Sequence, residues 1–468
     1  MLRRRDILTG SSAALIAGAM PRFAWGKTEA DVVIIGAGLA GLMAAQRLEA
    51  AGLKIVIVEG ENRVGGRLHT LDDLPGKPEA GGIQVGRGYA HLRSTAQKLG
   101  IELLEGPSGG AGAAESRTAL FHINGQTIAA NNWPNSPANH LAAAEKGILP
   151  LALGFHYGSR LPQLGSVSDW MSADPAQDIS FAQALKAAGA SPEALRLIQA
   201  NFNGNALTDM SQLSNKRATA IFRAGPGPIS TIKGGSQRLP EAMAAALASP
   251  VRQRQIVSAI AEDAAGVTVS LADGQNIRAR HAICTLPFAA LRSVRISGSI
   301  APPIRKLIAT LPDTQASFVY LSASEAFWKM DGQPETLWTD DPLLGRVFVL
   351  GDSPPMLKVW TTGASALALG RLTPEQAGSA IISRIEAARP SAKGKLKLER
   401  ILSWRKNPMA RGIYHHIGTG QAQTLAQAVQ TKGRRLHFAG EHMAQLSSGM
   451  EAALESGDRI GKLVAALV

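Results

Sequence analysis

The sequence predicts an α/β fold in which two domains are built from interleaved segments of one chain. Its 468 residues are too many for one simple hydrophobic core. A β-branched run at 32–35 leads into a helical apolar pattern at 39–51, and a buried-strand pattern follows at 54–58. This order of strand, helix and strand is that of a Rossmann-type βαβ unit with parallel strands.

The turn between the first strand and the helix has the glycine pattern G-x-G-x-x-G of a dinucleotide site. Gly36 permits a tight turn, Gly38 lets the backbone approach a pyrophosphate, and Gly41 lets the helix pack closely against the strand. The helix N-terminus, with Ala40 in its first turn, offers free N–H groups and a positive dipole end to the phosphates. Glu59 ends the second strand, where it can accept hydrogen bonds from the adenosine ribose hydroxyls.

A second glycine-rich loop directly follows this acidic residue. Its adjacent glycines allow the backbone to approach another anionic surface, and the arginines on either side can bind phosphate oxygens through paired hydrogen bonds. The loop residues predicted to bind the dinucleotide are Gly60, Arg63, Gly65, Gly66 and Arg67.

These motifs resemble those of the flavin-containing amine oxidase family. The R-x-G-G-R segment at 63–67 resembles the one that follows the ribose-binding acid and binds FAD in that family. Near the C-terminus, H-F-A-G-E-H at 437–442 and S-G-M-E-A-A-L-E-S-G at 448–457 resemble its closing FAD motif. The resemblance covers essentially the whole chain after the first thirty residues, and it implies a two-domain FAD-binding fold with an α+β substrate domain.

The resemblance implies further contacts with FAD. Residues 79–84 would run beside the isoalloxazine ring, and the backbone of a strand at 255–257 would touch the adenine. The closing glutamate would bind the ribityl or phosphate region. Two serines at 447–448 replace the cysteine through which monoamine oxidases attach FAD, so noncovalent FAD is expected. The residues implied are Gly82, Ile83, Val257, Gly440, Glu441, Gly449 and Met450.

The resemblance also implies a substrate slot between two side chains at the flavin, which are the predicted catalytic residues. Tyr414 would form one wall, and Met450 stands where relatives carry the second aromatic ring. A thioether fills space and contacts rings but has no π face. Ser317 stands where relatives carry a lysine that is linked through water to flavin N5, and Lys306 comes too early. Whether O2 or another acceptor reoxidises the flavin is therefore left open.

The implied activity is oxidation of a C–N bond in a small amine or amino acid to an imine. A desaturase-like flavoprotein that acts on a C–C bond and a noncatalytic FAD-bearing binding protein are the alternatives. The net charge is +13. The sequence has no run of lysines and arginines with interleaved aromatic residues, so nucleic-acid binding is not predicted. No spacing of His, Cys, Asp or Glu predicts a metal site.

Residues 1–26 resemble a twin-arginine export signal. Arg4-Arg5 precede a short, mildly apolar stretch at 11–20 and small residues near 26. That stretch is too short to span a bilayer, so we expect no stable membrane span, a periplasmic location and the twin-arginine export machinery as a partner. The single cysteine, Cys284, excludes an intrachain disulfide.

The motifs divide the remaining chain into alternating segments. We expect an FAD-binding domain from 28–88, 230–300 and 400–468, and a substrate-binding domain from 89–229 and 301–399. Two hairpin turns are predicted, at Asn124-Gly125 and at Asp273-Gly274.

Overall fold

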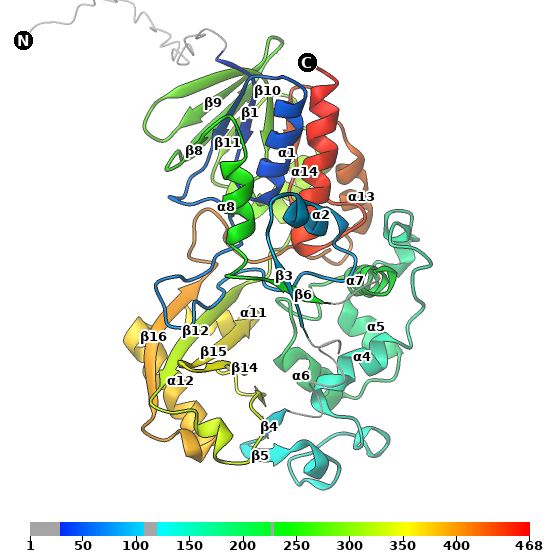
Figure 1. Cartoon of the computed structure of the whole chain (residues 1–468). Coiled ribbons are helices and arrows are strands. Elements are labelled where there is room, and N and C mark those ends of the chain that lie inside the picture. The colour runs from blue at the N-terminus through cyan, green and yellow to red at the C-terminus, as the bar shows by residue number, and fades with distance from the viewer. Residues whose placement is uncertain (1–28, 107–118, 226–228) are drawn as a thin grey trace, which may run out of the picture.

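Two large β-sheets organise the computed structural model, which describes residues 29–106, 119–225 and 229–468 (Figure 1). The expected export signal lies outside these residues. The first sheet has the strand order β11-β8-β9-β10-β1-β2-β7, and β17 pairs with β10. Its strands are β1 (Ala30–Ile35), β2 (Ile55–Val58), β7 (Val251–Arg252), β8 (Val257–Glu262), β9 (Val267–Leu271), β10 (Asn276–Cys284), β11 (Arg295–Ser297) and β17 (Leu436–Phe438).

The predicted βαβ unit is present in the first sheet. β1 and β2 are parallel, and α1 (Leu39–Ala50) connects them. The C-terminal helix α14 (Gly449–Ala465) lies along α1 (Figure 1). The approach is close, because a Cβ atom at Gly457 of α14 would lie 2.3 Å from the carbonyl oxygen of Ala40. The two ends of the described chain, which contain the two FAD-type motif blocks, are therefore neighbours in space.

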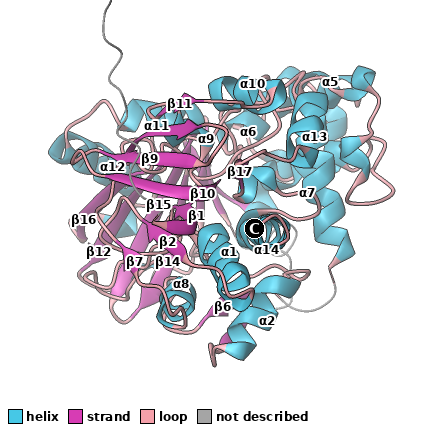
Figure 2. Ribbon diagram, turned by 90° about the horizontal axis from the view of Figure 1, so that it is seen from above, coloured by secondary structure: helices cyan, strands magenta, loops and turns pink. Residues whose placement is uncertain are grey.

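Helices cover both faces of this sheet, as the view from above shows (Figure 2). Successive side chains of β1 point alternately to the two faces of the sheet and so pack against different helices. Val33 and Ile35 pack in a core with α10 (Pro302–Thr310) and α13 (Ala422–Gln430), whereas Val32 and Ile34 pack with α1 and α14. Burial on both faces explains the continuous apolar run that predicted the strand.

The second sheet has the order β16-β12-β15-β14-β13-β4-β5. One face packs on α11 (Gly363–Leu369) and α12 (Pro374–Ala388), and the other faces the loops of the first domain. The expected domain boundary at 400 falls inside β16, which belongs to this sheet. The strands are β4 (Leu120–Ile123), β5 (Gln126–Ala129), β12 (Ala316–Ala323), β13 (Leu337–Thr339), β14 (Arg346–Asp352), β15 (Pro355–Thr362) and β16 (Leu396–Ser403).

A helical region beside the second sheet has its own core, which contains Trp133, Phe181 and Leu197. Trp338 of β13 packs edge-on against Phe121 and joins this core to the sheet. The helices are α4 (Leu153–Gly158), α5 (Phe181–Ala187), α6 (Pro192–Ala200) and α7 (Gln212–Ala224). The remaining α-helices and strands of the described residues are α2 (Ala90–Lys98), α8 (Arg238–Ala245), α9 (Phe288–Leu291), β3 (Leu103–Glu105) and β6 (Ser230–Ile232).

Both predicted hairpin turns are confirmed. Asn124 and Gly125 join β4 to β5 with φ angles of 50° and 74°, and Gly274 has a φ of 90° between β9 and β10.

Cys284 is fully buried in the first sheet, and burial raises the pKa of its thiol to about 12. Among the described residues, no helix has the length and apolar character needed to cross a membrane.

Candidate active site

A cavity of about 640 Å³ lies between the two sheets and receives side chains from both. Its volume is within the range of typical small-molecule sites. One end is formed by the glycine turn after β1 and by the end of β2. The other end is formed by aromatic and basic side chains of the second sheet. Predicted cofactor residues that line it are Gly36, Gly38, Ala40, Glu59, Gly65, Gly66, Arg67, Gly82, Ile83, Gly440, Glu441, Gly449 and Met450.

The glycine turn has the shape that a pyrophosphate site requires. A Cβ atom at Gly41 would lie 1.9 Å from the carbonyl oxygen of Gly36, so only glycine lets α1 start so close to β1. At Gly38, by contrast, an added Cβ would meet nothing within 4 Å, because this position faces the cavity. The backbone at the start of α1 is thus open to a bound anionic group.

Glu59 is buried at the end of β2, and both of its carboxylate oxygens are oriented by backbone groups. They accept hydrogen bonds of 2.8 Å from the N–H groups of Ala37 and Glu61. Burial raises the pKa of Glu59, and these two hydrogen bonds oppose that rise. A carboxylate oxygen has more than one lone pair, so Glu59 can still accept from a ribose hydroxyl.

Four predicted cofactor residues do not line the cavity: Gly41, whose packing against β1 is described above, Gly60, Arg63 and Val257. Arg63 donates to the carbonyl oxygens of Leu68 and Gly66 at 2.8 and 2.7 Å and pairs with Glu61 at 2.6 Å, so it holds its own loop in shape. Gly60 packs against Met409, whose sulfur would lie 2.5 Å from an added Cβ.

Val257 is the fourth of these residues. It begins β8 and its side chain is buried in the core of the first sheet, whereas the predicted adenine contact is one of its backbone. The strand nevertheless approaches the ribose-binding end, because the N–H of Gln255 donates to the carbonyl oxygen of Glu59 at 2.8 Å.

Glu441 is buried and joins three segments of the chain at the cavity wall. It accepts hydrogen bonds from Arg67 at 3.1 Å and from the backbone N–H of His415 at 2.9 Å, and its other oxygen lies 2.6 Å from Nδ1 of His415. Burial alone would raise the pKa of Glu441, but the charges of His415 and Arg67 and the hydrogen bonds from His415 hold it well below its usual range. Glu441 is therefore a permanent anion at this wall.

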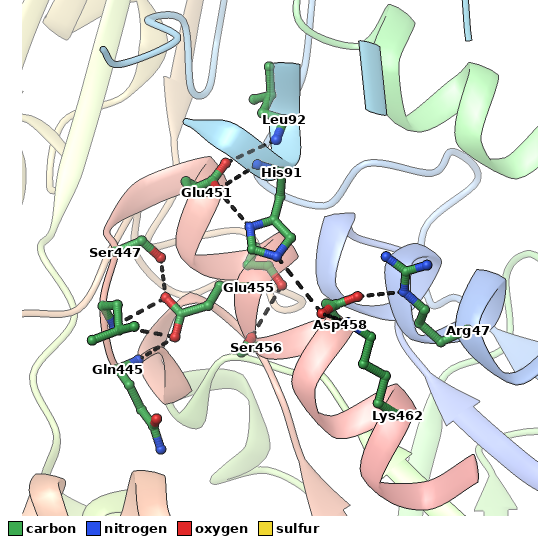
Figure 3. A network of polar contacts seen from close by, with 12 residues as sticks. Arg47, His91, Leu92, Gln445, Ser447, Glu451, Glu455, Ser456, Asp458 and Lys462 are labelled. Atoms are coloured by element: carbon green, nitrogen blue, oxygen red, sulfur yellow. Dashed lines mark hydrogen bonds and ion pairs between the residues drawn. The ribbon is translucent and has the colours of Figure 1, made fainter. Parts of the chain in front are cut away.

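The start of α14 is held in place by a polar network (Figure 3). Glu451, next to Met450, accepts hydrogen bonds from the N–H groups of His91 and Leu92 at 2.7 and 3.0 Å, and its Oε1 lies 2.8 Å from Nδ1 of His91. Ser447 donates to Glu455 one turn further along the helix. These bonds tie the N-terminus of α2 and the 445–447 segment to α14, so Gly449 and Met450 are presented rigidly to the cavity.

The far end of the cavity is lined by rings and one thioether. Half-buried Tyr414 donates to the carbonyl oxygen of Asn203 at 3.1 Å, and Met450 lies beside Gly82. Phe318 and Trp360 face the same space with ring centroids 4.7 Å apart. Tyr414 and Met450, the predicted walls, are thus brought to one cavity with two rings that sequence reasoning did not place there.

Two basic side chains at this end were also missed. Lys358 and Arg346 come from neighbouring strands, β15 and β14, and line the cavity. The sequence feature that could have indicated Lys358 is its position as the one charged residue in the apolar run 356–360. Ser317 points to the opposite face of its strand, where its hydroxyl lies 3.4 Å from the carbonyl oxygen of Ala366.

In the part of the chain that the structure describes, no group of three or more His, Cys, Asp or Glu side chains could hold a metal ion.

Comparison with known proteins agrees with this geometry. The family model described as flavin containing amine oxidoreductase matches residues 39–464. The flavin-dependent L-tryptophan oxidase RebO of Lentzea aerocolonigenes is 24% identical, over 91% of this chain and 96% of its own. A probable flavin-containing monoamine oxidase A of Dictyostelium discoideum is 22% identical, over 92% and 96%.

Solved structures show the same fold. Cyclohexylamine oxidase from Brevibacterium oxydans IH-35A superposes with a TM-score of 0.76 at 21% identity, covering 94% of this chain and 99% of that one. Putrescine oxidase bound to putrescine superposes with a TM-score of 0.71 at 19% identity, covering 93% and 99%. The family model covers most of the sequence, and its motif residues line the cavity. The chain belongs to the flavin-containing amine oxidoreductase family, with FAD as its cofactor.

Proposed function

We propose that this protein is an exported FAD-dependent oxidoreductase that oxidises the C–N bond of a small amine or amino acid to an imine. The observation that carries the proposal is one continuous cavity, which runs from the glycine turn at Gly38 to the ring-lined end at Tyr414. Relatives named as tryptophan, monoamine and cyclohexylamine oxidases support a nitrogen-bearing substrate.

The residues divide into those that would hold FAD and those that would hold the substrate. Gly38 and the N-terminus of α1 would hold the pyrophosphate, Glu59 the ribose, and the backbone at Gly82 the ring system. FAD would supply a two-electron acceptor for the hydride equivalent that leaves the carbon next to nitrogen. Tyr414 and Met450 would orient that carbon and exclude water from it.

Helix α14 would contribute electrostatics at the same place. Its N-terminus, at Gly449 and Met450, lines the cavity, and the partial positive charge there favours a developing negative charge on a bound group. The network around Glu451 keeps this helix end fixed, so little reorganisation is needed during the reaction.

Anaerobic reduction of the bound flavin tests the proposed reaction. The purified holoprotein should lose its flavin absorbance when mixed with at least one member of a panel of amines and amino acids, and the matching carbonyl compound should be recovered. Bleaching only by apolar substrates that lack nitrogen would favour a desaturase. Flavin that no substrate bleaches would favour a binding protein.

Attachment of the cofactor is tested separately. Because Ser447 and Ser448 replace the attachment cysteine of relatives, acid precipitation should leave the flavin in the supernatant. Flavin that stays with the precipitated protein would contradict noncovalent binding.

We also propose a twin-arginine export route and a periplasmic location. Arg4-Arg5 and the short apolar stretch after them support this route, as does the cofactor, because the route carries folded proteins that already contain one.

A further inference from the structure

A lysine is buried at the reacting end of the cavity, on the second sheet. Lys358 of β15 is only 2% exposed, and its Nζ donates to the carbonyl oxygen of Glu79 at 2.7 Å. The ammonium group lies 4.2 Å from the ring centroid of Phe318 and 5.1 Å from that of Trp360. Among the described residues no carboxylate is within ion-pair distance of Nζ, so the charge in this wall of the cavity has no direct ion-pair partner.

The pairing of two strands brings this lysine to the face from which Ser317 turns away. β12 and β15 are antiparallel, with Phe318 opposite Trp360 and Tyr320 opposite Lys358. Residues two apart on a strand share a face, so Lys358, Trp360, Phe318 and Tyr320 all point the same way. The cavity-facing part of β12 has no basic residue, and β15 provides one in its place.

We propose that Lys358 supplies the positive charge at the reacting end and thereby makes the reduced cofactor reactive toward O2. This inference rests on the proposed function. Reduced, anionic flavin, one O2 and one proton yield oxidised flavin and hydrogen peroxide, so two electrons pass to oxygen. Negative charge develops on oxygen during this transfer, and a fixed cation in a site that excludes water stabilises it.

The charge on Lys358 also gives the reaction a pH dependence. Burial lowers the pKa of Lys358 to about 7, and the charge of Glu79 opposes that effect. The other ionisable groups that face it are the hydroxyl of Tyr320, whose pKa burial raises, and Arg346 beyond Trp360. Because the pKa is lowered, Lys358 is charged below about pH 7 and becomes neutral as the pH rises through that value. Reactivity toward O2 should therefore fall over the same interval.

Reoxidation of the holoprotein tests this role without any amine substrate. The flavin is reduced with dithionite under anaerobic conditions and mixed with O2 between pH 6 and 9, for the parent and for K358M, K358R and K306M. K358M should slow reoxidation by about 10²–10³-fold, the usual effect of removing one preorganised electrostatic group. K358R should retain most of the rate and lose the pH step, because a guanidinium stays protonated. K306M is the matched control, since Lys306 is exposed on α10, and should behave as the parent.

Sulfite titration gives a second readout that does not depend on turnover. Sulfite adds to N5 of oxidised flavin and brings negative charge there, so K358M should weaken its binding about 10-fold or more, and K358R and K306M should not. Unchanged reoxidation and sulfite binding in K358M would overturn the inference, and so would a persisting pH step in K358R. Failure of every amine to bleach the flavin would contradict the proposed function alone.

Discussion

Replacing Glu441 with alanine should destabilise the protein strongly, because this carboxylate is the shared acceptor for Arg67 and His415. The substitution removes the ion-pair partner of Arg67, which keeps its bond to the carbonyl oxygen of Ile413, and leaves Nδ1 of His415 without its acceptor. Removing one partner of a buried ion pair costs ~3–5 kcal/mol. Glutamine keeps one acceptor oxygen and loses the charge, so Glu441→Gln should cost about 1–3 kcal/mol.

Urea unfolding of flavin-free protein measures these costs, since a bound cofactor would add its own stabilisation. The control is Glu375→Ala, which removes an exposed carboxylate in the first turn of α12 and should change the unfolding free energy by no more than about 1 kcal/mol. Unfolding of Glu441→Ala at the same urea concentration as Glu375→Ala would refute a stabilising role of Glu441.

The pH dependence of the Glu441 effect follows from the direction of its pKa shift. The pKa is lowered in the folded protein, so the stabilisation is complete above the ordinary glutamate value of 4.5 and is lost as the pH falls below it. The difference in stability between the parent and Glu441→Gln should therefore shrink on acidification below about pH 4. A difference that grows on acidification would contradict the assignment of Glu441 as a permanent anion.

Three further predictions concern the cofactor, the substrate walls and export. Gly38→Val should fold, because open space surrounds the new Cβ, and should contain little flavin by absorbance; a normal flavin content would refute the pyrophosphate site. Tyr414→Ala should slow anaerobic flavin reduction by up to about 10²-fold through misorientation of the substrate, and Met450→Tyr should change amine preference without changing flavin content; parental rates in both would place the pocket elsewhere. Replacing Arg4 and Arg5 with lysine should keep folded, yellow protein in the cytoplasm, as fractionation would show.

The dinucleotide end of the cavity could be predicted from the sequence because the interactions that shape it are made between residues close together in the chain. The β-branched run, the spacing of Gly36 and Gly41 and the acid at Glu59 all act within one βαβ unit, and the structure places them as expected. Arg63 shows the limit of such reasoning. A guanidinium donates equally well to phosphate and to carbonyl oxygens, and only the folded loop reveals that Arg63 binds Leu68 and Gly66.

The substrate end depends on pairing between strands that lie far apart in the sequence. Aligning residues along β12 alone makes Ser317 the counterpart of a lysine and leaves the site without a cation. The sheet register reverses that conclusion, because β15 runs antiparallel beside β12 and its alternation sends Lys358 to the face that Ser317 leaves. A basic side chain reaches the cavity from any strand whose side chains alternate onto the cavity-facing side of the sheet. Either β12 or its neighbour β15 can therefore carry the basic residue. A motif read along one strand therefore detects the loss of a residue but cannot detect its replacement from the neighbouring strand.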